Sequence, residues 1–147
     1  NITSRQKMCL AANYGGNAIN KQLAGYVHAF AHTLGSIYHI PHGNAIAMCL
    51  IPIMEFQKNK CLKKLALLSK YCELSDSNED DEVSANKLLD EISKLKDLCN
   101  FKNYNNLIEK KDYKLIYKGV VSDSINYSAP LTLKRKDIFK ILDEISK

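Results

Sequence analysis

Glycine and proline are scarce in this sequence, which has 6 Gly and 3 Pro among its 147 residues. Such a composition argues against an all-β chain rich in turns and against a low-complexity chain. Leu, Lys, Ile and Ala are abundant, and this content favours helix. A chain of this length, 46% hydrophobic and 25% charged, fits one domain that buries a sizeable core. We therefore expect a single all-α domain over residues 1–147, built as a helical bundle.

Long apolar runs and paired cysteines are also missing. No run reaches the roughly 20 apolar residues of a membrane span. The longest, residues 45–56, contains Pro52 and Glu55. The five cysteines include no CxxC pair, and their odd number is unlike a disulfide framework. We expect a cytoplasmic protein that binds no membrane, with Cys49 as a buried, inert thiol.

A concentrated basic surface is the third absence. The net charge of +5 comes from scattered lysines and short clusters such as Lys134-Arg135-Lys136. Neither a long basic block nor an aromatic RNA-reading motif accompanies them, so we expect no nucleic-acid partner.

Apolar residues recur at helical spacing along most of the chain. The pattern predicts helices over residues 5–23, 23–34, 45–56, 58–74, 84–101 and 135–147. Residues 75–82 read as an acidic loop, residues 102–117 as one or two short helices, and residues 120–133 as an extended, turn-rich stretch.

Glycine and proline set the expected helix boundaries. Gly15 and Gly16 form a weak point in the first helix, and Gly35 should end the second. Pro41 excludes helix at the preceding residue and predicts a turn through residue 43, with Asn44 as the next N-cap. Pro52 should kink the apolar helix that follows.

All four histidines fall within fifteen residues, in the stretch HAFAHTLGSIYHIPHG. His28 and His32 are four residues apart in a helical pattern, so they project from one face. His42 lies between a proline and a glycine on the predicted turn, which can direct its ring back toward that helix. His39 has no spacing argument in its favour. Histidine is a common metal ligand and proton carrier near neutral pH, so this clustering points to chemistry.

Two interpretations of the cluster remain open from spacing alone. A histidine in an apolar helix is often a core residue bonded to a backbone carbonyl. The alternative is a metal site with His28 and His32 as the pair and His42 as a third ligand, open at one position and suited to Zn or Fe. No carboxylate in the window completes such a site, because Glu55 lies a helix away.

The segment GYVHAFAHTLGSIYHIPHGNAIAMCLIPIMEF, residues 25–56, resembles the signature of the iron-containing (group III) alcohol dehydrogenases. In that family G-x-x-H-A-x-A-H-x-L-G leads to P-H-G and then to an apolar helix ending near M-E-F. Residues 4–8 and residues 126–142 are weaker matches to the preceding helix and to the closing Tyr-Pro-x-Pro segment. Tyr127 and Pro130 are kept there, and Ser128 stands where the first proline would fall.

The resemblance implies a two-domain enzyme of which this chain is the helical, metal-carrying C-terminal domain. An N-terminal α/β domain would bind NAD or NADP, and its Gly-Gly-Gly-Ser loop is absent from this sequence. The Asp and first His that share the metal in the family are absent too. The sequence opens on NITSRQKMCL, without an initiator Met or a signal-like segment. We therefore expect a fragment that is inactive alone and whose missing ligands lie upstream.

Carried over by position, the resemblance makes His28 and His42 the ligands of Fe²⁺ or Zn²⁺ and gives His32 a role in proton transfer. It assigns His39 no role and identifies no cofactor-binding residue. Three aromatic residues near the motif line either the substrate pocket or, as their residue types favour, the core: Tyr26, Phe30 and Tyr38.

The expected reaction interconverts a primary or secondary alcohol and its aldehyde or ketone, with hydride passing to or from NAD(P). The partners would be this small-molecule substrate and the dinucleotide-binding domain, and a homo-oligomer is left open. The competing hypothesis is a stand-alone helical module that binds a metal or another protein without catalysis.

Overall fold

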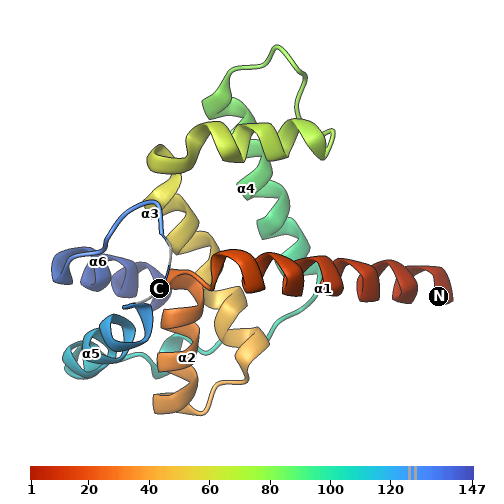
Figure 1. Ribbon diagram of the computed structural model, residues 1–147. Coiled ribbons are helices and arrows are strands. Elements are labelled where there is room, and N and C mark those ends of the chain that lie inside the picture. The colour runs from red at the N-terminus through yellow and green to blue at the C-terminus, as the bar shows by residue number, and fades with distance from the viewer. Residues whose placement is uncertain (126, 128) are drawn as a thin grey trace.

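The computed structural model describes residues 1–125, 127 and 129–147. All regular secondary structure in these residues is helical (Figure 1). No strand occurs in these residues, which confirms the all-α prediction. The elements are α1 (Ile2–Gln22), α2 (Tyr26–Tyr38), α3 (His42–Tyr71), α4 (Asp81–Leu98), the short 3₁₀ helices η1 (Asn105–Leu107) and η2 (Lys110–Asp112), α5 (Tyr113–Ser124) and α6 (Arg135–Ile145).

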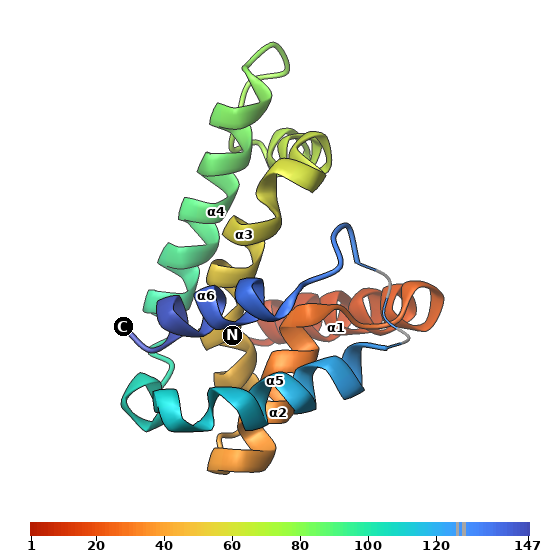
Figure 2. The same ribbon diagram turned by 90° about the vertical axis from the view of Figure 1, so that its left-hand side faces the viewer.

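Four helices enclose the main core. α2 packs against α3 and α5, and α6 packs against α3 and α5, while α4 runs beside α3 (Figure 2). Apolar residues at helical spacing supply the buried faces, which explains why these segments form amphipathic helices. The largest fully buried side chains come from all four elements: Phe30 and Leu34 of α2, Ile53 of α3, Ile116 of α5, and Ile138, Ile141 and Leu142 of α6.

The helical geometry of α3 is interrupted at Cys61, whereas Pro52 lies inside the continuous helix. The backbone angles of Cys61 are φ −125° and ψ 18°, outside the helical range. Beyond the bend, Leu65 packs with Ala85 and Leu88 of α4 in a second, smaller apolar cluster. The break detected in α3 therefore lies nine residues after the proline at which a kink was expected, and it separates two clusters of buried residues.

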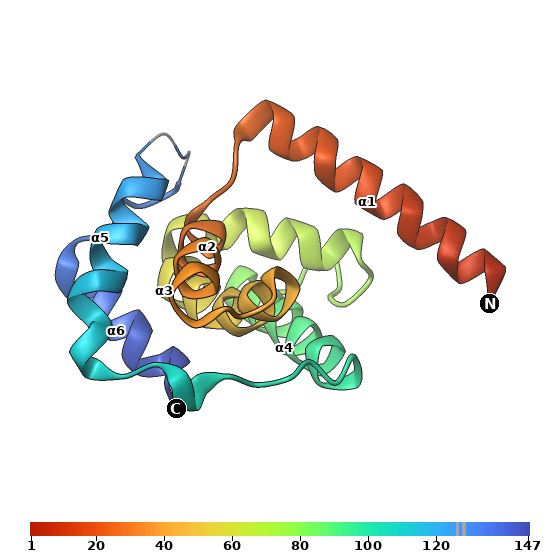
Figure 3. The same cartoon turned by 90° about the horizontal axis from the view of Figure 1, so that it is seen from below.

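α1 stands apart from the rest of the molecule (Figure 3). Every described side chain from Asn1 to Lys21 is exposed, including apolar ones such as Met8 and Leu10. The helix begins at an Asn1 cap, whose side chain accepts hydrogen bonds from the N–H groups of Thr3 and Ser4. It continues without a break through the predicted weak point at the glycine pair.

Two helix boundaries differ from the sequence-based expectation. Gly35 does not end α2, which continues to Tyr38. α3 begins at His42, with Pro41 as its N-cap, so the predicted turn is shorter and Asn44 is already helical. Both changes follow from a tight reversal between the helices, in which the proline supplies a φ of −56° suited to the start of a helix.

The stretch 120–133 was expected to be extended, and its first five residues instead complete α5. Tyr113, Ile116 and Val120 form the buried face of this helix and extend it past the predicted limit. The remaining described residues of the stretch carry no helix. Asn126 and Ser128, which belong to the same expectation, lie outside the described residues.

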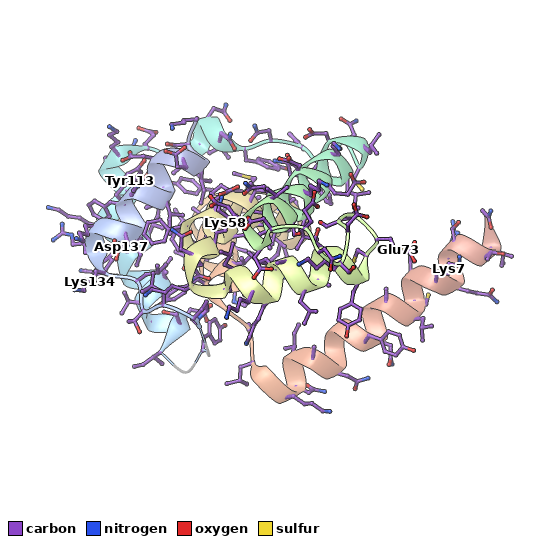
Figure 4. All side chains as sticks on the ribbon, turned by 90° about the horizontal axis from the view of Figure 1, so that it is seen from above. Lys7, Lys58, Glu73, Tyr113, Lys134 and Asp137 are labelled. Carbon is purple, nitrogen blue, oxygen red and sulfur yellow. The ribbon has the colours of Figure 1, made fainter. Side chains whose placement is uncertain are left out.

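Polar side chains fix the ends of α5 and α6. The hydroxyl of Tyr113 donates to Asp143 Oδ1 at 3.0 Å, and the backbone N–H of Lys134 donates to Asp137 Oδ2 at 2.8 Å. Figure 4 shows Tyr113, Lys134 and Asp137 together on the side of the molecule away from Lys7 of α1.

None of the helices in the described part of the chain combines the length and the apolar content required to cross a membrane.

Candidate functional site

Three imidazoles converge where α2 faces the beginning of α3. The ring centroids of His28 and His32 are 5.7 Å apart, and those of His28 and His42 are 5.5 Å apart. The rings of His32 and His42 are stacked at 5.2 Å. The structure therefore brings together the three residues that sequence analysis singled out, from two different helices.

α2 places its two histidines beside its core face. Ala29, Phe30 and Leu34 are buried in the main core, which fixes the rotation of the helix. His28 and His32 stand one turn apart beyond that buried stripe, half-buried and exposed respectively.

A three-residue connection returns the chain so that His42 faces α2. His39 adopts the left-handed conformation, with φ 55° and ψ 34°, and its side chain is exposed. The carbonyl oxygen of Ile40 then passes so close to Gly35 that a Cβ there would lie 3.1 Å from it. Glycine permits this close approach, and Pro41 caps the new helix. His39 therefore shapes the reversal, and its ring is not one of the three that converge.

The environment of His28 favours its neutral form. Burial lowers its pKa below the ordinary value of 6.5, and the nearby rings of His32 and His42 lower it further. The carboxylate of Asp123 acts in the opposite direction. A neutral imidazole keeps the lone pair that a metal ligand needs.

Asp123, on the last turn of α5, is a site residue that sequence analysis missed. Its Oδ2 lies 2.9 Å from Nδ1 of His32 and accepts a second hydrogen bond, at 3.1 Å, from the hydroxyl of Tyr127. Asp123 and His32 are 91 residues apart, so no local spacing links them. The available signal was the helical spacing of Tyr113, Ile116 and Val120, which continues to this carboxylate.

The three aromatic residues near the motif are engaged elsewhere. Phe30 is fully buried in the main core. Tyr26 is buried, and its hydroxyl accepts a hydrogen bond from the N–H of Leu133 at 3.0 Å. Tyr38 donates to Asp112 Oδ2 at 2.9 Å, and burial followed by this hydrogen bond raises its pKa to about 12. These contacts confirm the core interpretation over the pocket interpretation.

Cys49 is completely buried, and burial raises the pKa of its thiol to about 12. A thiol held protonated is a poor nucleophile and a poor metal ligand, which confirms the predicted inert role. All five cysteines are free.

The donor chemistry of the cluster fits part of a transition-metal site. Imidazole nitrogens suit Fe and Zn, and two or three of them converge here. Glu55, the acid considered from the sequence, pairs with Lys58 at 3.2 Å. In residues 1–125, 127 and 129–147, no group of three or more His, Cys, Asp or Glu side chains has the geometry to hold an ion. The cluster thus offers an incomplete set of ligands.

A family model described as "Fe-containing alcohol dehydrogenase family, C-terminal" matches residues 1–146. Alcohol dehydrogenase 4 of Saccharomyces cerevisiae is 25% identical over 142 residues, covering 95% of this chain. The 1-propanol dehydrogenase PduQ of Citrobacter freundii is 34% identical over 100 residues, covering 67% of this chain. The solved structure of an alcohol dehydrogenase from Oenococcus oeni superposes with a TM-score of 0.89 and 27% identity over 98% of this chain.

The chain spans only part of each of these proteins: 36% of the yeast enzyme, 27% of the Citrobacter enzyme and 38% of the Oenococcus chain. The fold and the family model agree along almost its whole length. The chain therefore belongs to the Fe-containing alcohol dehydrogenase family and corresponds to the C-terminal domain of its members.

Proposed function

We propose that this chain is the metal-carrying helical part of an NAD(P)-dependent alcohol dehydrogenase. The enzyme would interconvert a primary or secondary alcohol and its aldehyde or ketone. The observation that carries the proposal is the convergence of three imidazoles from α2 and α3 within 5.7 Å, in a chain that belongs to this family. The names of its relatives, among them a 1-propanol dehydrogenase, support an alcohol substrate.

In this proposal His28 and His42 would hold the metal, either Fe²⁺ or Zn²⁺. The lowered pKa of His28 supports this role, because the ring is then neutral and free to donate its lone pair. His42 stands on the first turn of α3, directly after Pro41, so its backbone is rigidly placed. A bound ion would supply Lewis-acid chemistry, polarising the oxygen of the substrate.

His32 would transfer the proton. Its side chain is exposed and its Nδ1 is bonded to Asp123, so Nε2 is the nitrogen left for exchange. In alcohol oxidation, a bound nicotinamide would supply the hydride acceptor for the carbinol carbon, and His32 would take the hydroxyl proton and pass it to solvent. General-base help of this kind contributes about 10²–10⁴-fold to a rate.

An upstream dinucleotide-binding domain would complete the site. The incomplete ligand set supports this, as does α1, whose apolar side chains such as Met8 and Leu10 are exposed. This chain spans only 36–38% of the yeast and Oenococcus relatives, whose remaining length would include such a domain. The missing carboxylate and further ligands would come from it.

The test is made in the full-length protein that contains this chain. Loaded with Fe²⁺ or Zn²⁺, it should reduce NAD⁺ or NADP⁺ in the presence of a short-chain alcohol, seen as nicotinamide absorbance. His42→Ala should lose this activity and the bound metal together. His39→Asn is the matched control, because that ring lies outside the cluster and asparagine tolerates the left-handed backbone at this position, so this variant should keep both.

Full activity and full metal content in His42→Ala would overturn the proposal. So would an enzyme that turns over no alcohol with either nucleotide.

A titration of residues 1–147 with Zn²⁺ distinguishes the stand-alone metal-binding module, which the family match does not favour. Two or three imidazoles without a carboxylate should bind the ion weakly, with binding weakened further in His28→Ala. Tight stoichiometric binding by these residues alone would support the module instead.

A further inference from the structure

We propose that Asp123 is a positioning residue, which fixes the orientation and tautomer of His32. This inference rests on the proposed function, in which His32 exchanges a proton with the substrate. It concerns a residue that lies on a different helix and far from the histidine motif in the sequence.

The contact geometry sets which nitrogen of His32 carries the proton. Nδ1 of His32 lies 2.9 Å from Oδ2 of Asp123. An ionised carboxylate can only accept, so Nδ1 must be the donor and must carry a hydrogen. In the neutral ring Nε2 then bears the lone pair, and it makes no hydrogen bond to a described residue. The contact therefore presents Nε2 as the nitrogen that can take up a proton.

The carboxylate is itself held in place. The hydroxyl of Tyr127 donates to the same Oδ2 at 3.1 Å, so this oxygen receives donors from two directions. The backbone N–H of Tyr127 in turn donates to the carbonyl of Ser124 at 3.0 Å, which ties Tyr127 to the end of α5. A carboxylate with two donors on one oxygen has little freedom to rotate away from His32.

Stability alone does not explain the arrangement. The side chains of His32 and Asp123 are 46% and 34% exposed, and exposed ion pairs contribute little to the stability of a fold. A contact that orients the ring matters even when it adds little to folding stability. In the wrong tautomer, Nε2 of His32 would carry a hydrogen where proton uptake requires a lone pair.

The experiment reads the tautomer directly. Full-length protein labelled with ¹⁵N-histidine and freed of metal by chelation is studied by NMR, with the His32 signals assigned from their loss in His32→Gln. The wild type should show the Nδ1–H tautomer. In Asp123→Asn the amide can donate to Nδ1, so the Nε2–H tautomer should become dominant. Asp123→Glu keeps a carboxylate and should restore the original tautomer.

Kinetics give an independent reading. In the metal-loaded enzyme, Asp123→Asn should lower kcat by about 10–100-fold, the loss seen when a residue that orients a metal-site histidine is removed, with KM and metal content little changed. Tyr127→Phe leaves the carboxylate in place and should cause a smaller loss of kcat. Asp90→Asn is the matched control, since this exposed carboxylate on α4 has no hydrogen-bond partner among the described residues.

An unchanged tautomer in a folded Asp123→Asn, or an unchanged kcat, would overturn the inference. Should Asp123→Asn fail to fold, Tyr127→Phe decides, and wild-type kcat in that variant would count against it. These outcomes are separate from a failure of the proposed function. In that case His42→Ala stays active or no alcohol is oxidised, while the NMR result for His32 is unaffected.

Discussion

Gly119 of α5 lies against Thr33 of α2 so closely that a Cβ on Gly119 would be 2.6 Å from Thr33 Cγ2. Asp123 stands one turn further along α5, and His32 directly precedes Thr33. The absence of a side chain at Gly119 therefore sets the separation of two helices at the place where their polar residues meet. The close helix contact and the hydrogen bond between Asp123 and His32 therefore both lie where α5 crosses α2.

Gly119→Ala should destabilise the domain and loosen that hydrogen bond. The added methyl must push α5 from α2, a kind of overpacking that typically costs about 1–3 kcal/mol. Urea unfolding measures the loss of free energy. Gly16→Ala is the matched control, because a Cβ there meets nothing within 4 Å and should stabilise its helix by about 0.5–1 kcal/mol. Equal stability of Gly119→Ala and the wild type would mean that the helices are not held this closely.

Gly35→Ala should weaken metal binding more than it weakens the fold. Its Cβ would lie 3.1 Å from the carbonyl oxygen of Ile40, so the reversal that places His42 must shift by a few tenths of an ångström. A misplaced ligand support costs roughly tenfold in affinity. Metal affinity of the full-length protein, measured by calorimetry, provides the comparison. An affinity equal to that of Gly16→Ala would show that the reversal tolerates the methyl group.

Tyr38→Phe should change how stability responds to alkaline pH. The pKa of Tyr38 is about 12 in the folded chain, against an ordinary value of 10.0. Between these values the folded state keeps a proton that the unfolded state has lost. The contribution of Tyr38 to stability is therefore complete below pH 10 and is lost as the pH rises toward 12. The variant should lack this part of the decline and, through the lost bond to Asp112, be less stable by ~1 kcal/mol at neutral pH.

Tyrosinate absorbance gives the check on Tyr38. A titration of the wild type minus that of Tyr38→Phe should isolate one phenol that ionises near pH 12. A difference curve centred near pH 10 would contradict the buried, hydrogen-bonded state of this hydroxyl.

Phe30→Ala should destabilise the domain by about 3–5 kcal/mol, the cost of emptying a fully buried aromatic position. Chemical denaturation measures this loss. The opposite result, a stable variant with an altered preference among alcohols, would instead place Phe30 in the substrate pocket.

The sequence predicted the parts of the site that lie close together along the chain. His28 and His32 share a helix face through their spacing, and the proline before His42 marks a reversal. These features depend on local geometry, which residue order controls directly. Helical periodicity likewise predicted the all-α class, because each helix buries one apolar stripe.

The parts that depend on packing between distant segments could not be predicted in this way. Asp123 reaches His32 only because α5 crosses α2. Gly119 permits that crossing, and no sequence motif marks this glycine. The bend at Cys61 is similar: Pro52 carries the stronger local signal, yet the backbone leaves the helical range nine residues later, where α3 begins to pack on a different part of α4. Gly35 is a further example, because the glycine is required by the close approach of the Ile40 carbonyl oxygen and not by the end of a helix.

The bend at Cys61 divides the interior of the molecule unequally. The cluster that includes Phe30 and Ile53 lies on the histidine side, and the cluster that includes Leu65 and Leu88 lies beyond the bend. Units that share few buried contacts open with their own free energies. Local opening of the end of α3 and the start of α4 would therefore leave the spacing of the three imidazoles unchanged.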